Sequence, residues 1–364
     1  MGGRAPAVRP GAARRVRRRP ASRRADRLRR GRADAAGHRR SAARRPACDR
    51  HRAAAHGAAH RAGADRRTLR GAAVVRAASA LDLYTRTAHA ASAHVISGYS
   101  TSFGYASRLL PREVRGGIAD VYALVRVADE IVDGPAAEAG LQRPEVLAIL
   151  DALEQDTLRA MACGFSANLV VHAFATTARR TGIGADLVRP FFESMRMDAT
   201  EHARFDHEQY RRYIHGSAEV VGSMCLRVFA LEQPGFTLDD RLEEGARRLG
   251  AAFQKVNFLR DLADDAGRLG RSYIPGLDPQ TFTDRDKAAV VDEIAEDLAV
   301  AREAIARLPR GSRRATTAAA ALFGRLNEQL RETPAAALRT TRVSVPLGRK
   351  LGILANAAAG RTTV

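Results

Sequence analysis

Two aspartates separated by one helical turn stand in the stretch VRVADEIVDG, residues 125–134. Asp129 and Asp133 are four residues apart, and Arg126 and Tyr122 precede them at intervals that place all four side chains on one helix face. Two carboxylates at this spacing repel each other weakly, and a divalent cation bound between them removes that repulsion. The stretch therefore indicates a metal-binding helix face, provided that further ligands come from elsewhere in the chain.

A second acidic helix face occurs in QKVNFLRDLADDAGRLGRSYIP, residues 254–275. Gln254, Asn257, Asp261 and Asp265 follow one another at intervals of three or four residues, and apolar residues fill most of the remaining helix surface. An amphipathic helix with its polar face in water has the same pattern. The pairing of two such motifs favours a shared Mg²⁺ site, because Mg²⁺ prefers oxygen ligands and keeps positions open for phosphate oxygens.

Arginines accompany both motifs. Arg126 precedes Asp129 by three residues, Arg260 directly precedes Asp261, and Arg271 lies farther along the second motif. Guanidinium groups bind phosphates in a bidentate manner, although these arginines also have the alternative of pairing with nearby carboxylates. Together the metal ligands and arginines predict a diphosphate substrate whose departure is assisted by metal.

The formal charge of +20 comes entirely from the N-terminal segment. Residues 1–76 hold 24 Arg and four acidic residues, whereas residues 77–364 are electrically balanced. The segment has no aromatic residue and few large aliphatic ones, which predicts a disordered basic tail. Three explanations remain open: an arm attracted to RNA or membrane, a targeting peptide, or translation assigned from a start that lies too far upstream. With the charge confined to the tail, no nucleic-acid partner is expected for the rest of the chain.

Residues 77–364 are expected to form one all-α domain, because helical periodicity continues nearly throughout. The expected helices are 80–97, 112–133, 143–162, 167–182, 185–198, 207–230, 239–265, 286–307, 312–331 and 346–359. The three cysteines are far apart in sequence, which indicates a reducing compartment without disulfides. No apolar run is expected to reach the length of a membrane span.

Four ordered motifs resemble those of the squalene/phytoene synthases. They are YSTSFGYASRLLP (99–111), YALVRVADEIVD (122–133), YRRYIHGSAEVVGSM (210–224) and the second acidic motif (254–275). The similarity extends from about residue 80 to the C-terminus. The resemblance implies a single-domain isoprenoid synthase, a helical bundle around a central cavity.

The resemblance also implies a reaction. Two geranylgeranyl diphosphates would condense head to head to phytoene through a cyclopropylcarbinyl diphosphate, with Mg²⁺ (or Mn²⁺) and without NADPH. Squalene or dehydrosqualene synthesis from farnesyl diphosphate is the alternative, and a non-catalytic assembly protein of the same fold is the alternative of another class. The enzyme would be cytoplasmic, in peripheral contact with the inner face of the membrane.

The resemblance assigns roles to individual residues. The metal ligands would be Asp129, Asp133, Asn257, Asp261 and Asp265, and Tyr213 would be catalytic together with the four aspartates. The substrate-binding residues would be Ser102, Phe103, Tyr122, Arg126, Ser217, Val221, Gln254, Asn257, Arg260, Arg271 and Tyr273. A carbocation must be kept from water, so some of the residues with assigned roles are expected to line the cavity. They are Phe103, Tyr122, Tyr213, Ser217 and Val221.

Overall fold

The computed structural model describes residues 79–100, 102–199, 204–262, 273–278 and 281–360. The predicted basic tail, residues 1–76, lies outside the described residues. The described residues belong to one compact unit that spans Ala73–Val364.

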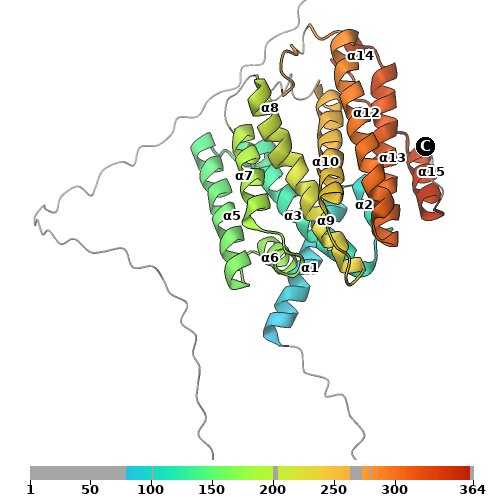
Figure 1. The fold of residues 1–364 in the computed structure, drawn as a ribbon. Coiled ribbons are helices and arrows are strands. Elements are labelled where there is room, and N and C mark those ends of the chain that lie inside the picture. The colour runs from blue at the N-terminus through green and yellow to red at the C-terminus, as the bar shows by residue number, and fades with distance from the viewer. Residues whose placement is uncertain (1–78, 101, 200–203, 263–272, 279–280, 361–364) are drawn as a thin grey trace, which may run out of the picture. The chain divides into compact units, whose positions relative to one another are not determined.

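Every regular element among the described residues is a helix, as the sequence predicts (Figure 1). Their order is α1 (Ala80–Tyr99), α2 (Ser102–Ser107), α3 (Arg112–Asp133), α4 (Pro135–Glu138), α5 (Arg143–Cys163), α6 (Leu169–Thr181), α7 (Ala185–Ala199), α8 (His207–Ile214), the π-helix η1 (His215–Glu219), α9 (Val220–Phe229), the short 3₁₀ helix η2 (Ala230–Glu232), α10 (Asp240–Arg260), α12 (Asp284–Arg307), α13 (Arg310–Glu332), α14 (Ala335–Leu338) and α15 (Leu347–Ala358).

All ten expected helices are present, and most of their ends agree within two residues. The exception is the helix expected at 239–265, where α10 ends at Arg260 because Asp261 leaves helical backbone geometry at φ −100° and ψ 10°. Residues 263–265 of that prediction lie outside the described residues. Three helices were not expected: α2, α4 and α14 have six residues or fewer. A helix of that length is too short to show a hydrophobic period.

Two large clusters of buried side chains make up most of the core among the described residues. The first packs α3 against α5, α6, α7 and α9, and includes Leu124, Leu150, Phe174, Phe191 and Met224. The second joins α8 and α10 to α12 and α13, and includes Tyr213, Phe258, Leu259, Ile294 and Leu330. The continuous segment α8–η1–α9 contributes to both clusters, so it lies between the two halves of the domain (Figure 1).

One stretch among the described residues, His207–Glu232, is long and apolar enough to cross a membrane by length and composition alone. The sequence analysis expected no apolar run of this length, and Arg211, Arg212 and Glu219 do interrupt the apolar residues of this stretch. Within the domain this stretch contacts α7 and α10. Packing inside the core therefore accounts for its apolar composition.

Glycines let α10 lie close against η1 and α9. A Cβ on Gly250 would lie 2.3 Å from the carbonyl oxygen of Ala218, and one on Gly222 would lie 2.2 Å from that of Ala246. Real Cβ atoms do not approach backbone oxygens so closely, so both contacts require glycine. The helices that border the site are thus held at a separation set by backbone contact.

Gly250→Ala is expected to lower the free energy of unfolding by about 1–3 kcal/mol, because the added methyl group forces two packed helices apart. Gly116→Ala in α3 is the matched control, since no atom lies within 4 Å of its added Cβ. The control is expected to be neutral or to stabilise the helix by about 0.5–1 kcal/mol. Urea unfolding followed by circular dichroism measures both, and equal stability of the two variants would contradict the close contact.

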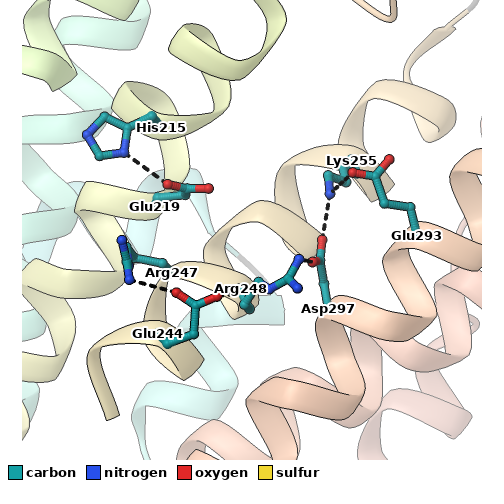
Figure 2. A network of polar contacts seen from close by, with 8 residues as sticks. All are labelled: His215, Glu219, Glu244, Arg247, Arg248, Lys255, Glu293 and Asp297. Carbon is teal, nitrogen blue, oxygen red and sulfur yellow. Dashed lines mark hydrogen bonds and ion pairs between the residues drawn. The ribbon is translucent and has the colours of Figure 1, made fainter. Parts of the chain in front are cut away.

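A buried ion-pair network fixes α10 against α12 (Figure 2). Lys255 of α10 places its Nζ atom 2.7 Å from Oδ2 of the fully buried Asp297 of α12, and it also pairs with Glu293. Arg248 donates from Nη1 to the other oxygen of Asp297 at 2.6 Å. Because both oxygens of a buried carboxylate are paired with cations, the network sets the rotation of α10 about its axis. The face that carries Asn257 is thereby turned away from α12.

Candidate active site

Three carboxylates lie close enough for their charges to interact, those of Asp129 and Asp133 in α3 and that of Asp198 in α7. Burial, followed by the neighbouring carboxylate of Asp133, raises the pKa of Asp129 from 3.8 to about 7, and Asp198 of α7 contributes to the same rise. The guanidinium of Arg126 acts in the opposite direction, with Nη1 2.7 Å from Oδ2 of Asp129. The carboxylates of Asp133 and Asp198 thus act on Asp129 as like charges, a repulsion that an added cation would relieve.

Arg126 is engaged within α3 and with α1. Besides Asp129 it pairs with Glu130, one turn farther along the helix, and its guanidinium lies 4.6 Å from the ring centre of Tyr99. Tyr122 is half-buried on the same face, and burial raises the pKa of its hydroxyl. The intrahelical pairing that the sequence left open for Arg126 is therefore present, and a diphosphate would have to share this arginine with the two carboxylates.

Asp198 joins the first motif to the predicted catalytic tyrosine. Its buried carboxylate accepts hydrogen bonds from the hydroxyl of Tyr213 at 2.8 Å and from that of Tyr273 at 2.9 Å. The sequence analysis missed Asp198. A signal was present, because Asp198 continues the buried face of α7 that Phe191 and Met195 begin, and an acid on such a face needs partners.

An aromatic cluster surrounds the two tyrosines. Tyr213 and Tyr273 have ring centres 5.0 Å apart, Phe258 of α10 stacks on Tyr273 at 4.6 Å, and Phe205 lies 5.3 Å from Tyr213. Burial, followed by the charge of Asp198, raises the pKa of Tyr213 well above its ordinary value of 10. The Tyr213 hydroxyl is therefore protonated at any physiological pH and acts as a hydrogen-bond donor to Asp198.

An apolar cavity of about 230 Å³ lies beside η1 and α9, which follow Tyr213 in the α8–η1–α9 segment. η1, α9 and α10 supply Ser217, Val221 and Gln254 to its lining, along with Phe253, whose ring stacks on Phe323 of α13 at 3.7 Å. Tyr122 and Tyr213, also expected in the lining, lie at the acidic site instead. The side chains of Ser102 and Phe103 lie outside the described residues.

The second motif begins on a partly exposed face of α10. Gln254, Asn257 and Arg260 are half-buried, as the predicted polar stripe requires. The residues that separate them are buried, namely Lys255, Val256, Phe258 and Leu259. The carboxylate of Asp261 accepts from Nε of Arg260 at 3.0 Å and from Nε of Arg342 at 2.7 Å. Arg342 was not expected at the site, since it lies 81 residues away in sequence. Asp265 and Arg271 lie outside the described residues.

The donor set suits a hard divalent cation. The candidate ligands Asp129, Asp133, Asn257 and Asp261 offer oxygen atoms, and the pKa of Asp129 is raised first by burial and then by the charge of Asp133. In the described part of the chain, which excludes Asp264 and Asp265, no three acidic, histidine or cysteine side chains converge closely enough to hold one ion. Mg²⁺ takes only a few carboxylates and keeps several of its positions for water and substrate oxygens, so it is the kind of ion that oxygen donors of this type would suit.

The raised pKa of Asp129 predicts how stability depends on pH without metal. The folded protein holds the Asp129 proton more tightly than the unfolded chain, so stability falls as pH rises from about 4 through about 7. With a chelator present, the midpoint of thermal unfolding should be lower at pH 8 than at pH 5, by on the order of 5 °C. Mg²⁺ at pH 8 should restore it.

Asp129→Asn serves as the control for this prediction, because the amide does not titrate. The variant should lose most of the difference between pH 5 and pH 8 and most of the response to Mg²⁺. A variant that retains the full pH difference would assign it to other titrating groups.

Solved structures with the same arrangement of helices identify the fold class. A squalene synthase from Alicyclobacillus acidocaldarius superposes with a TM-score of 0.58 at 22% identity, covering 69% of this chain and 95% of that one. A dehydrosqualene synthase solved with a ligand superposes with a TM-score of 0.62 at 19% identity, covering 76% of this chain and 98% of that one. The fold is thus the all-α fold of the head-to-head isoprenoid synthases.

The chain belongs to the squalene/phytoene synthase family, whose sequence model matches residues 96–349. Among named relatives, a 15-cis-phytoene synthase of Paracoccus sp. is 33% identical over 189 residues, 51% of this chain and 59% of that protein. A phytoene synthase of Pseudescherichia vulneris is 30% identical over 215 residues, 56% of this chain and 67% of that protein. The matched region therefore spans about three fifths to two thirds of these relatives.

Proposed function

We propose that this chain is a prenyltransferase that joins two geranylgeranyl diphosphates head to head to give phytoene. The observation that carries the proposal is the course of the α8–η1–α9 segment. Tyr213 borders the acidic site, and Ser217 and Val221 line the apolar cavity. One segment thus connects a place for a diphosphate with a place for a hydrocarbon chain. The named phytoene synthases support this choice of substrate.

Mg²⁺ (or Mn²⁺) held by Asp129, Asp133, Asn257, Asp261 and Asp265 would supply the positive charge that stabilises the departing diphosphate. Arg260 and Arg342 hold Asp261 in place before substrate arrives. Each presents guanidinium donors beside the proposed diphosphate position, and Arg271 is proposed to add a further one. The arginines thereby orient the leaving group relative to the cavity.

The residues that line the cavity are proposed to exclude water. The allylic cation formed when diphosphate leaves would react with any water nearby, so the hydrocarbon chain has to lie in an apolar enclosure. The cavity walls meet this need through Val221, Phe253 and the small residues of α10. We propose that the Tyr213 hydroxyl, which donates to Asp198, directs a proton at the polar end.

Two alternatives follow from particular observations. The solved structures with this fold include a squalene synthase and a dehydrosqualene synthase, which favours farnesyl diphosphate as the alternative substrate. Squalene formation consumes NADPH, whereas phytoene and dehydrosqualene formation do not. A non-catalytic assembly protein of the same fold is disfavoured, because Asp129, Asp133, Asp261 and Asp265 are all retained.

Incubation of the purified protein with each prenyl diphosphate and Mg²⁺, with and without NADPH, tests the proposal. Phytoene from geranylgeranyl diphosphate, unchanged by NADPH, is the expected product. Squalene or dehydrosqualene from farnesyl diphosphate, with geranylgeranyl diphosphate unused, would replace the proposed substrate by the alternative. Binding of either diphosphate without any turnover would point to the assembly protein.

The basic segment 1–76 is proposed to play no part in catalysis. A chain that begins at residue 77 should retain its rate of product formation within about twofold, because the family motifs begin near residue 99. If the segment bound RNA, truncation would instead abolish an RNA affinity that falls steeply with salt. Filter binding at several salt concentrations, run beside the activity assay, separates the two.

We propose a cytoplasmic location in contact with the inner face of the membrane. The hydrocarbon product has no polar group and partitions into a bilayer, which supports contact with a membrane. Cys163 and Cys225, the two cysteines in the described part of the chain, are both free thiols, which suits a reducing compartment.

A further inference from the structure

α15 leaves an apolar stripe uncovered. Leu354 and Ala357 pack against α2 and α13, whereas Leu347 and Leu351 on another side of the helix are 61% and 49% exposed. These leucines are four residues apart, so they share one face, and the exposed Ala355 extends that face by a further turn. The helix lies at the edge of the bundle beside α13 (Figure 1). Contiguous exposed apolar surface often marks a site of interaction with a protein or a membrane.

The C-terminal segment that carries this stripe has charge of a single sign. Glu332 is the last acidic residue of the chain, and residues 333–364 contain five basic residues and no acid. Two of the five, Arg349 and Lys350, lie on α15 itself and form no ion pair with any described acidic residue. Residues 77–332, by contrast, hold 31 basic and 36 acidic residues.

A groove of about 770 Å³ adjoins the stripe, between α15 and the pair α12–α13. Ile305, Ala321 and Ile353 contribute apolar surface to it. Arg302 and Arg314 line it as well, and neither forms an ion pair with an acidic residue in the part of the chain that the structure describes. Arg325 and Glu328 also line the groove and pair with each other. The exposed leucines, the apolar groove and the unpaired cations extend over α12, α13 and α15.

We propose that this surface, formed by Leu347, Leu351, Arg349, Lys350 and the arginines of the adjoining groove, docks on an anionic lipid bilayer. Leucines enter the acyl boundary while neighbouring cations meet lipid phosphates, the arrangement by which an amphipathic helix lies in a membrane interface. A second copy of this chain fits less well, because two identical surfaces would bring cations against cations. The inference is independent of the proposed reaction, since it uses no residue of the acidic site or its cavity.

The absence of tryptophan from the chain allows a sharp test. Leu351→Trp introduces a single fluorescent reporter on α15, and Ile149→Trp places one on α5 at a position that is also exposed, at 41%. Both full-length variants carry the basic tail, so attraction of the tail to lipid affects them equally. Circular dichroism checks that each variant keeps its helical content, and Leu347→Trp is a second reporter of the same stripe.

Vesicles of phosphatidylcholine mixed with phosphatidylglycerol should shift the emission of Leu351→Trp to shorter wavelength, and lipids brominated on the acyl chain should quench it. Ile149→Trp should show neither effect, and pure phosphatidylcholine vesicles should give a smaller shift. Adding Arg349→Glu and Lys350→Glu to Leu351→Trp should raise the lipid concentration at half-maximal shift about tenfold or more.

Three results would overturn the proposal. The first is no vesicle-dependent shift at Leu351→Trp or Leu347→Trp. The second is an equal shift at Ile149→Trp, which would indicate contact through another face. The third is a shift that depends on protein concentration without lipid, which would assign the stripe to self-association. Each readout is fluorescence of the protein itself, so failure of the proposed reaction leaves the result interpretable.

Discussion

Asp129→Asn is expected to lower the rate of product formation by about 10³-fold or more while leaving helical content unchanged. The amide is a weaker ligand for Mg²⁺, and loss of the metal contribution removes several kcal/mol of charge stabilisation as diphosphate departs. The fold should tolerate the change, because burial and the charge of Asp133 raise the pKa of Asp129 to about 7, so a neutral side chain is already accommodated at this position. Steady-state kinetics and far-ultraviolet circular dichroism measure the two effects.

Asp261→Asn should produce a loss of similar size, since the two motifs are proposed to hold one metal cluster. Asp292→Asn is the control, because Asp292 is an exposed residue of α12 whose partner is the exposed Arg331. The control should keep its rate within about twofold. Near-normal turnover in either Asp129→Asn or Asp261→Asn would mean that the two-motif metal site is wrong.

The long helices could be predicted from the sequence because each carries an apolar face over several turns. The contacts within the candidate site could not be predicted from helical periodicity. Asp198 meets Tyr273 across 75 residues, and Arg342 meets Asp261 across 81 residues. Contacts between residues so far apart depend on how helices pack, and no local pattern encodes them. The sequence therefore indicated which helix faces are polar, but not which partners those faces meet.

The π-helix η1 is a second feature that periodicity could not supply. It shifts the helical register between Tyr213 and Val221, and Gly216 within it lies against α7 so closely that a Cβ would be 2.1 Å from the carbonyl oxygen of Pro190. Ser194 of α7 donates to the carbonyl of Tyr213 at 3.2 Å. A π-turn within an α-helix often marks a functional site. Here η1 lies between Tyr213, which borders the acidic site, and Val221, which lines the cavity.

Tyr213→Phe is expected to slow formation of the cyclopropyl intermediate by roughly 10²–10⁴-fold, the usual effect of removing one positioned proton-transfer group. The phenylalanine ring keeps the contacts with Tyr273, Phe258 and Phe205, so the aromatic cluster stays filled. Asp198 loses one of its two tyrosine donors and keeps Tyr273. Conversion of the intermediate to hydrocarbon, when it is supplied directly, should be affected much less.

Tyr210→Phe is a matched control for this experiment. Tyr210 lies three residues before Tyr213, is similarly buried, and has a hydroxyl without a hydrogen-bond partner among the described residues. Its variant should form the intermediate at the normal rate. Equal impairment of both half-reactions in Tyr213→Phe would assign the hydroxyl to general positioning of the diphosphate. If neither half-reaction is slowed, Tyr213 serves only to pack the aromatic cluster and to satisfy the buried carboxylate of Asp198.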